Sequence, residues 1–328
     1  MEIDLYLDPF VRLLEEVAPI GQLRAIEKGA SGDELWRKIE ESGYIDAFVP
    51  DAEGNPMLPA SAAPALFGAL GRRLVPLPVA ETMIARALIA SAGGEVPAGA
   101  IALAIAHPEA DGWRTGSTEG ITHAEHALVE LEGGLTLVAI SGSPEVAIEP
   151  TEGGAGILRS TTATTMPFRF SGPPAGLRPI IAAIRAAMIA GAADEVGRLT
   201  ISYAGTRAQF GKPIGRYQAV QQQLAELAEQ IVMARMAAQI GFASGLVPTL
   251  EATAITKQVA SVAAHRVAAI AHAVHGAIGI TAEFDLQLYT RSLHRWRLSE
   301  GTESYWAGRL GGACLSSGQS VLDFIRSV

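Results

Sequence analysis

Three short segments in the second half of the chain hold residues that could bind a phosphorylated ligand and move a proton. The first runs from Arg207 to Ile214 and has the sequence RAQFGKPI. The second runs from His275 to Glu283 and has the sequence HGAIGITAE. The third is Glu300-Gly301-Thr302. Together they supply a cation, a loop of small residues and a carboxylate.

Glu300 is the candidate for proton chemistry. A Glu-Gly-Thr sequence at the start of a helix places a carboxylate on a flexible corner, close to backbone N–H groups. Removal of a proton from carbon requires such a base, and it requires hydrogen-bond donors that hold the negative charge as it develops. The alternative is that Glu300 is an ordinary helix-start residue, favoured there by the helix dipole.

Arg207 and the small residues near Gly276 are candidates for ligand binding. A planar guanidinium group pairs well with a pyrophosphate through two parallel hydrogen bonds. Small side chains at Gly276, Ala277 and Gly279 would let the backbone approach a ligand closely. The alternatives are that Arg207 is a solvated cation at a helix end and that Phe210 is a core residue.

Other kinds of site are not expected. His272 and His275 have the i, i+3 spacing of a metal pair, but no third ligand stands near them, so we expect helix-end histidines and no metal. The stretch around Ser141 does not match a G-x-S-x-G nucleophile elbow. No P-loop and no dinucleotide-binding G-x-G-x-x-G sequence occurs in the chain.

In this order the three segments resemble the motifs of the acyl-CoA dehydrogenase family, and the resemblance is specific over roughly residues 175–312. It implies an FAD-dependent α,β-dehydrogenation of an acyl-CoA thioester. Glu300 would be the base that removes the α-proton while a hydride leaves the β-carbon for flavin N5. The backbone N–H of Glu300 would hold the carbonyl oxygen, and Gly301 would contact the substrate.

The resemblance also assigns residues to the cofactor. Arg207 would reach the FAD pyrophosphate of a neighbouring subunit, and Phe210 would pack at the cofactor. The complete set implied is Arg207, Gln209, Phe210, Gln218, Gly276, Ala277, Thr302 and Ser304. The chain departs from the family pattern at three of its positions, with Ala277 for the usual second glycine, Ala273 for a usual glutamine and Ser304 for another glutamine.

Sequence patterns predict three regions and an α+β, mainly α fold. Residues 1–96 have the pattern of a helical domain. Residues 97–172 contain short apolar runs that predict a small β-domain, among them 101–106, 126–131 and 135–140. The segment 132–134 between two of these runs predicts a hairpin turn, and the run 160–165 has high β-propensity. The family architecture implied is a helical N-domain, a central β-domain and a C-terminal four-helix bundle.

Residues 173–328 return to helical patterns. An Ala-rich helix is expected over 177–203, and a helix over about 250–274 should end at Gly276. Between them, one apolar stripe recurs at i, i+4, i+7 and i+11 through Val220, Leu224, Leu227 and Ile231. The last helix should begin near Thr302.

Composition excludes several classes of protein. The chain has 328 residues and a net charge of −9 without any run of Lys or Arg, so nucleic-acid binding is not expected. No apolar run reaches the ~20 residues needed to span a bilayer. The first residues lack the features of a signal peptide, and Cys314 is the one cysteine. These observations favour a cytoplasmic protein, and a hydrophobic content of 49% favours an oligomer.

The short β-domain keeps other interpretations open. The segment 106–112 is a remnant of a family strand that contacts flavin and substrate, and Trp113 beside it could lie next to a flavin. By resemblance the assembly is a homotetramer or an α2β2 heterotetramer, and the electron acceptor is an electron-transfer flavoprotein. The alternatives are a non-catalytic or cofactor-lending subunit of a heteromeric dehydrogenase, and a flavin-free protein that binds acyl-CoA. The sequence does not identify the acyl group.

Overall fold

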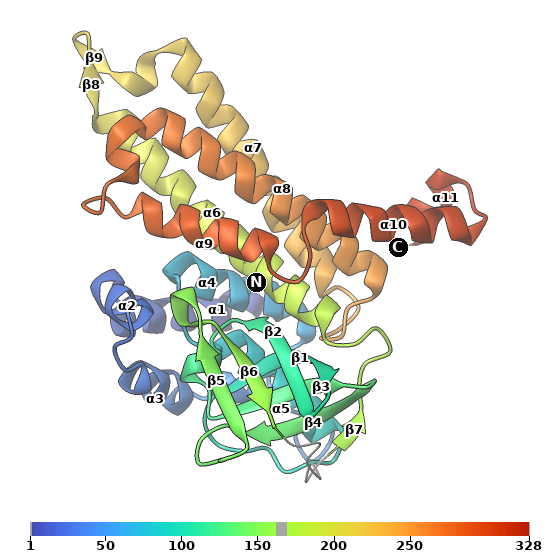
Figure 1. Cartoon of the computed structure of the whole chain (residues 1–328). Coiled ribbons are helices and arrows are strands. Elements are labelled where there is room, and N and C mark those ends of the chain that lie inside the picture. Colours follow the sequence, from blue (N-terminus) through green and yellow to red (C-terminus); the bar gives the residue numbers. More distant parts are fainter. Residues whose placement is uncertain (1, 162–168, 328) are drawn as a thin grey trace. The chain divides into compact units, whose positions relative to one another are not determined.

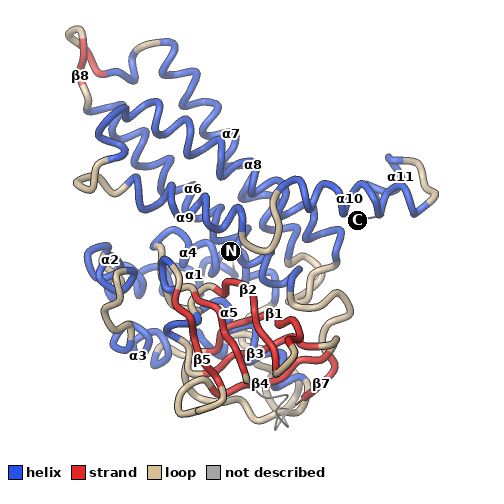
Figure 2. Tube along the Cα trace, in the orientation of Figure 1, coloured by secondary structure: helices blue, strands red, loops and turns tan. Residues whose placement is uncertain are grey.

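The computed structural model describes residues 2–161 and 169–327, and the chain divides into two compact units. The sheet unit comprises Met1–Ala62 and Val75–Ile181, and the bundle unit comprises Ala63–Leu74 and Ala182–Val328. Figure 1 labels their elements, and Figure 2 shows that the strands belong to the sheet unit apart from one small hairpin. Helix α4 (Ala63–Arg73) therefore groups with the C-terminal helices. The domain limits drawn at residues 96 and 172 stay a prediction.

The sheet unit begins with a group of α-helices. They are α1 (Glu2–Val17), α2 (Ile20–Glu27) and α3 (Asp33–Glu41), and α5 (Val79–Ser91) follows later in the chain. In α3 the buried side chains are Leu35, Trp36 and Ile39, a helical spacing that leaves the charged residues on the other face.

Among the described residues the sheet has seven strands in the order β5-β6-β2-β1-β3-β4-β7. Only β1 and β3 run parallel, and the other neighbouring pairs are antiparallel. The bounds are β1 (Ile101–Glu109), β2 (Gly112–Thr118), β3 (His126–Leu131), β4 (Gly134–Ala139), β5 (Val146–Pro150), β6 (Gly156–Ser160) and β7 (Arg169–Ser171).

The hairpin turn between β3 and β4 is confirmed. Leu131 pairs with Gly134, so two residues form the turn. These are Glu132 with φ 50° and Gly133 with φ 74°, the backbone signature of the tight turn whose twist matches that of the flanking strands. Of the Thr-rich run, Ser160 ends β6, and residues 162–165 lie outside the described residues.

Trp113 belongs to the core of the sheet unit. Its side chain is 1% exposed and lies in a cluster with Ala104, Val129 and Leu158. The expectation that this indole lies next to a flavin is therefore wrong, because a ring enclosed by aliphatic side chains has no face left for a cofactor. In β2, Trp113 and Thr115 lie on the same, buried side of the strand.

The bundle unit is built from long helices and confirms the predicted mainly α character. Its helices after α4 are α6 (Arg178–Thr206), α7 (Gln218–Gly241), α8 (Leu250–His275), α9 (Leu286–Leu298), α10 (Glu303–Ser317) and α11 (Val321–Ser327). The predicted ends at Gly276 and Thr302 are found where expected, because Gly276 follows α8 and Thr302 precedes α10. Of the predicted stripe in α7, Leu227 and Ile231 are buried.

Glycines allow α4 and α6 to cross closely. A side chain at Gly71 would meet the backbone of Met188, and one at Gly191 would meet the backbone of Gly68. The crossing therefore requires glycine, because a Cβ atom would force the two helices apart. None of the described helices is both long enough and apolar enough to cross a bilayer.

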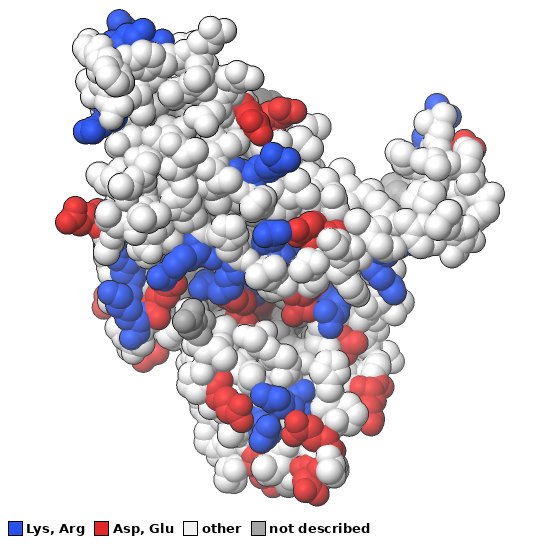
Figure 3. Space-filling view, turned by 45° about the horizontal axis from the view of Figure 1, so that its top comes forward, with Lys and Arg blue, Asp and Glu red and all other residues white. Residues whose placement is uncertain are grey.

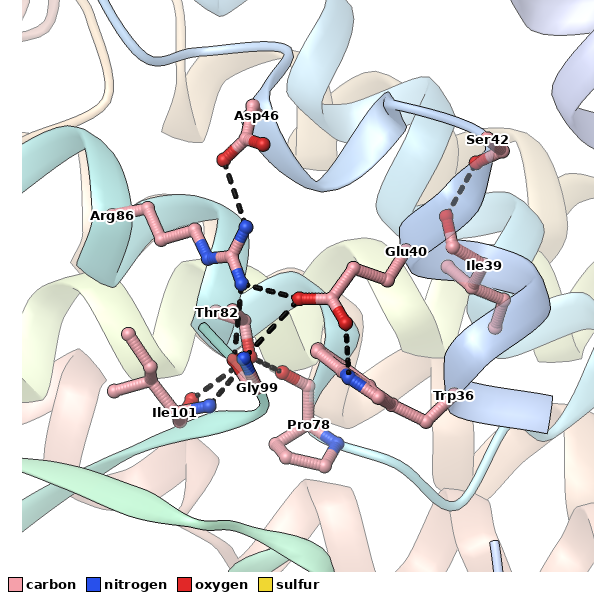
Figure 4. A network of polar contacts seen from close by, with 10 residues as sticks. All are labelled: Trp36, Ile39, Glu40, Ser42, Asp46, Pro78, Thr82, Arg86, Gly99 and Ile101. Carbon is pink, nitrogen blue, oxygen red and sulfur yellow. Dashed lines mark hydrogen bonds and ion pairs between the residues drawn. The ribbon is translucent and has the colours of Figure 1, made fainter. Parts of the chain in front are cut away.

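A network around Arg86 joins separate segments of the sheet unit (Figure 4). The Arg86 side chain is 6% exposed and contacts Glu40 Oε1 at 2.6 Å and Asp46 Oδ1 at 3.0 Å. It also donates to the carbonyl oxygen of Gly99 at 3.2 Å, and the Gly99 N–H donates to Glu40. One turn earlier in α5, Thr82 Oγ1 accepts the N–H of Ile101 at 2.9 Å. These bonds fix the start of β1 against α3 and α5.

We expect Arg86→Met to lower the free energy of unfolding by about 2–3 kcal/mol, because the buried carbonyl of Gly99 and the partly exposed carboxylates of Glu40 and Asp46 lose a charged donor. The matched control is Arg37→Met, whose exposed pair with Glu41 has side chains 58% and 62% exposed. That variant should change the free energy by less than ~0.5 kcal/mol. Urea unfolding of both variants tests this, and equal losses would show that the network contributes no more than a surface pair.

Candidate active site

The Glu300-Gly301 corner joins α9 to α10 in an unusual backbone conformation. Glu300 has φ 54° and Gly301 has φ 104°. A residue with a Cβ atom rarely adopts such a φ, and each strained residue of this kind costs about 1–3 kcal/mol unless its surroundings hold it. Strain concentrates at functional sites, so the corner is a candidate site on backbone grounds alone. The corner ends at Thr302, which is the N-cap of α10 and whose Oγ1 accepts a hydrogen bond from the Tyr305 N–H at 3.3 Å.

Hydrogen bonds from buried donors hold this corner. Lys257 Nζ donates to the carbonyl oxygens of Arg297 at 2.8 Å and Gly301 at 3.0 Å. The indole N–H of Trp306 donates to the carbonyl oxygen of Glu300 at 3.0 Å. Arg297 also forms an ion pair with Glu303 across the corner. Carbonyl groups on both sides of the candidate base are therefore fixed by side chains of α8 and α10.

Lys257 and Trp306 were not among the residues that sequence reasoning selected. Both are fully buried, and burial lowers the pKa of Lys257 to about 7, against the opposing effect of the Glu300 and Glu303 carboxylates. The available signal was a single lysine within an otherwise uncharged stretch of α8, from Ala252 to Ala264. Such a residue is rarely buried unless its ammonium group is paired or hydrogen-bonded.

The segment after α6 forms a hairpin with an exposed tip. Ala208–Gln209 (β8) pairs with Lys212–Pro213 (β9) through a two-residue turn in which Phe210 has φ 50° and Gly211 has φ 82°. The Phe210 side chain is 93% exposed, so the alternative that it is a core residue is wrong. The turn itself explains this, because it turns the side chain away from the helices.

Charged and polar groups on this hairpin are accessible. The Arg207 side chain is exposed and has no ion-pair partner among residues 2–161 and 169–327. Gln209 and Gln218 are also exposed, and the hydroxyl of Tyr217 braces the turn by donating to the carbonyl oxygen of Gln209 at 3.0 Å. The hairpin therefore presents a cation and an aromatic ring on a locally braced turn.

The small-residue loop at the end of α8 lies at the same end of the bundle unit. The Tyr203 ring, one turn before the hairpin, stacks on the His275 ring with centroids 4.4 Å apart. Gly276, with φ 64°, and Ala277 follow and are exposed. The structure thus brings together Arg207, Gln209, Phe210, Gln218, Gly276 and Ala277.

The two histidines of this region are held by the protein. His275 Nδ1 donates to the carbonyl oxygen of Ala271 at 2.8 Å, and His272 Nε2 lies 3.0 Å from Thr290 Oγ1. Burial lowers the pKa of both rings. Within the described ranges, no group of three or more His, Cys, Asp or Glu residues is arranged to hold a metal ion.

Glu300 is far from this cluster along α8. Lys257, which holds the corner, and His275, which begins the loop, are 18 residues apart in one helix, or about 27 Å at 1.5 Å per residue. Figure 1 shows the β8–β9 hairpin and α10 at opposite ends of the helices of the bundle unit. The residues selected from sequence therefore form two groups in one chain, with Thr302 and the exposed Ser304 beside Glu300 and Gly301.

The hairpin end has the donors that a dinucleotide such as FAD requires. An exposed guanidinium group suits a pyrophosphate, an exposed aromatic ring suits a flat ring system, and open backbone at Gly276 suits close approach. On these features Arg207, Phe210 and Gly276 fit the cofactor that the resemblance implies.

Comparison with known proteins supports the same family. Residues 182–311 match the family model of the acyl-CoA dehydrogenase C-terminal domain. The chain is similar to acyl-CoA dehydrogenase IpdE2 of Mycobacterium tuberculosis, with 31% identity over 268 residues that cover 80% of each protein. It is 28% identical to IpdE2 of Mycolicibacterium smegmatis over 304 residues, which cover 89% of this chain and 92% of the relative.

Solved structures confirm the predicted fold. A variant of the Tcur3481-Tcur3483 steroid ACAD aligns with a TM-score of 0.84 and 25% identity over 97% of this chain and 99% of that chain. The ChsE4-ChsE5 complex from Mycobacterium tuberculosis aligns with a TM-score of 0.77 and 23% identity over 98% of this chain and 99% of that chain.

We expect Gly301→Ala to lower the free energy of unfolding by about 1–3 kcal/mol, because φ 104° strains any residue with a Cβ atom. The new Cβ would also lie 2.5 Å from Tyr305 Cδ1 and 2.9 Å from Trp306 Nε1. Gly308→Ala is the control, since this glycine lies inside α10 with open space around it. It should be neutral or stabilising by up to about 1 kcal/mol. Thermal unfolding compares the two, and a neutral Gly301→Ala would show that the corner is not strained.

Proposed function

Since the chain belongs to the acyl-CoA dehydrogenase family, we propose that it catalyses the α,β-dehydrogenation of an acyl-CoA thioester with Glu300 as the base. The Glu300 carboxylate takes the α-proton, and its backbone N–H holds the thioester carbonyl oxygen as negative charge develops there. Bound FAD would accept the hydride that leaves the β-carbon. Gly301 lets the substrate approach the corner because it has no side chain.

The fixed corner supports this role for Glu300. A base must stand within hydrogen-bond reach of the proton it removes, and a flexible Glu-Gly loop would not keep it there. Hydrogen bonds to the carbonyls of Arg297, Glu300 and Gly301 hold the backbone of the corner. A backbone that is held in this way keeps Glu300 at one position relative to a bound substrate.

The separation of the two groups along α8 is the observation that carries the second part of the proposal. Lys257, beside the first group, and His275, beside the second, are about 27 Å apart along α8. We therefore do not expect the two groups of one chain to contact the reacting end and the pyrophosphate of the same site. We propose that Arg207, Gln209, Phe210, Gln218, Gly276 and Ala277 bind an FAD held mainly by a partner chain. Glu300 and Gly301, with Thr302 and Ser304, serve the site of their own chain, which a partner completes in return.

Exposed apolar side chains on α7 support an assembly of this kind. Val232, Met233, Met236 and Ile240 are 49%, 43%, 63% and 40% exposed. Figure 3 shows wide uncharged areas over the bundle unit and mixed charges elsewhere on the face displayed, which suits a protein partner. Two of the similar structures are named for two different chains, Tcur3481-Tcur3483 and ChsE4-ChsE5. We therefore propose a heterotetramer, and a homotetramer is the competing outcome.

The substrate class follows from the same comparison. The similar structure with the highest identity quoted above is called a steroid ACAD, so we propose a CoA thioester of a bulky, steroid-like acid. An electron-transfer flavoprotein is the proposed acceptor. The second candidate function is a cofactor-lending subunit, which the exposed Arg207 end favours and which requires no chemistry from Glu300.

We expect Glu300→Gln to lower the turnover of the assembled enzyme by about 1000-fold, because general-base catalysis contributes on the order of 10²–10⁴. The flavin absorbance per complex should stay at the wild-type value, since the change is isosteric. Glu53→Gln, in an exposed loop of the sheet unit, should leave turnover unchanged. Substrate-dependent bleaching of the flavin measures the rate. Full activity in Glu300→Gln would contradict the role of Glu300 as the base and would favour the second candidate function, a cofactor-lending subunit.

We expect Arg207→Met to weaken FAD binding about tenfold or more, because a hydrogen bond between charged groups contributes about 1.5–3 kcal/mol. Arg266→Met is the control, since its side chain is 60% exposed and its pairing with Glu226 spans 3.9 Å. FAD released after denaturation is measured for the chain alone and after co-expression with a candidate partner. Unchanged FAD affinity in Arg207→Met would remove the hairpin from the cofactor site.

A further inference from the structure

The backbone at Glu300 needs an external support, and Lys257 is the group placed to give it. Glu300 stands between Arg297 and Gly301, whose carbonyl oxygens both accept hydrogen bonds from Lys257 Nζ. The third bond of the ammonium group goes to Ser261 Oγ at 3.1 Å, one turn along α8. All three donors of the lysine are therefore used, two on the corner and one on its own helix.

The charges that act on Lys257 come from α6, α9, α10 and the corner between the last two. The carboxylates of Glu300, in the corner, and Glu303, in α10, favour the ammonium form. The guanidinium groups of Arg185 in α6 and Arg297 in α9 oppose it. A buried lysine is costly, and an apolar residue of similar volume is often as stable in such a place. Fold stability alone therefore does not explain a lysine at this position.

We propose that Lys257 is a positioning residue that holds the Glu300-Gly301 corner in the geometry needed for proton abstraction. It acts through the carbonyls of Arg297 and Gly301 and does not touch the substrate. This inference rests on the proposed role of Glu300 as the base. A third carbonyl, that of Glu300 itself, accepts a hydrogen bond from Trp306 Nε1. Side chains of α8 and α10 therefore hold the corner together.

The test compares Lys257→Met with Thr256→Val. Methionine keeps the length and burial of lysine without its donors. Thr256 is also buried in α8, but its hydroxyl donates to the carbonyl oxygen of Ala237 in α7 at 2.7 Å, so Thr256→Val removes a bond of the same kind away from the corner. Amide hydrogen exchange of residues 299–303 in the unliganded chain reports the order of the corner without any need for activity.

For Lys257→Met we expect exchange in 299–303 to rise at least tenfold while the remainder of the bundle unit exchanges as in the wild type. In the assembled enzyme kcat should fall about 100-fold, the cost of a misplacement of ~1 Å, with KM and FAD content unchanged. The acidic limb of the pH–rate profile should move to higher pH, because a carboxylate that loses a nearby cation is protonated more readily. Thr256→Val should show none of these changes.

The outcomes separate this inference from the proposed function. Unchanged exchange in 299–303 overturns the positioning role, whatever the enzyme does. Faster exchange with wild-type kcat shows that the corner is held by Lys257 but is not catalytic, which also overturns it. Activity in Glu300→Gln overturns the proposed base and leaves the exchange result standing. If Lys257→Met does not fold, Lys257→Leu, which also lacks a donor but fills a smaller volume, gives the same readouts. A crystal structure with Nζ beyond 3.5 Å from both carbonyls overturns the inference directly.

Discussion

A buried ammonium group bonded to carbonyls on both sides of Glu300 is the interaction on which the candidate site depends. Lys257 Nζ lies 2.8 Å and 3.0 Å from those oxygens, and the backbone between them has a φ of 54° that a glutamate does not keep by itself. The helices α8, α9 and α10 meet at this point. Their packing therefore fixes the position of a carboxylate that its own sequence, Glu-Gly-Thr, would leave free to move.

The length of α8 explains why the candidate residues form two separate groups in one chain. The helix connects Lys257 to the loop that begins at Gly276, and a straight helix of that length cannot bring its ends together. Tyr203 stacked on His275 fixes the hairpin to the distal end. Under the proposed function, a chain built in this way would donate groups to a partner at one end and receive groups from that partner at the other.

Much of the fold could be predicted from sequence because it depends on local rules. The turn at Glu132-Gly133, the end of α8 at Gly276 and the cap at Thr302 each follow from a residue and its immediate neighbours. The family motifs also identified Arg207 and Glu300 as candidates. Lys257 and Trp306 were missed because their roles arise from contacts 44 and 6 residues away. Trp113 was misjudged for the same reason, since exposure is set by tertiary packing, and the exposure of Phe210 excludes only the alternative that it is a core residue.

The two ends of α8 differ in how far they are organised before any partner or ligand binds. The Glu300 corner is held by buried donors within one chain, so its geometry is complete before assembly. The hairpin is braced only locally, by bonds such as Tyr217 to Gln209, and it carries a phenylalanine that is 93% exposed. An apolar ring gains about 25 cal/mol for each Å² removed from water, so this end gains most by binding. The fold thus separates a candidate catalytic corner, which is ordered by its own chain, from an exposed region that the proposed assembly would complete.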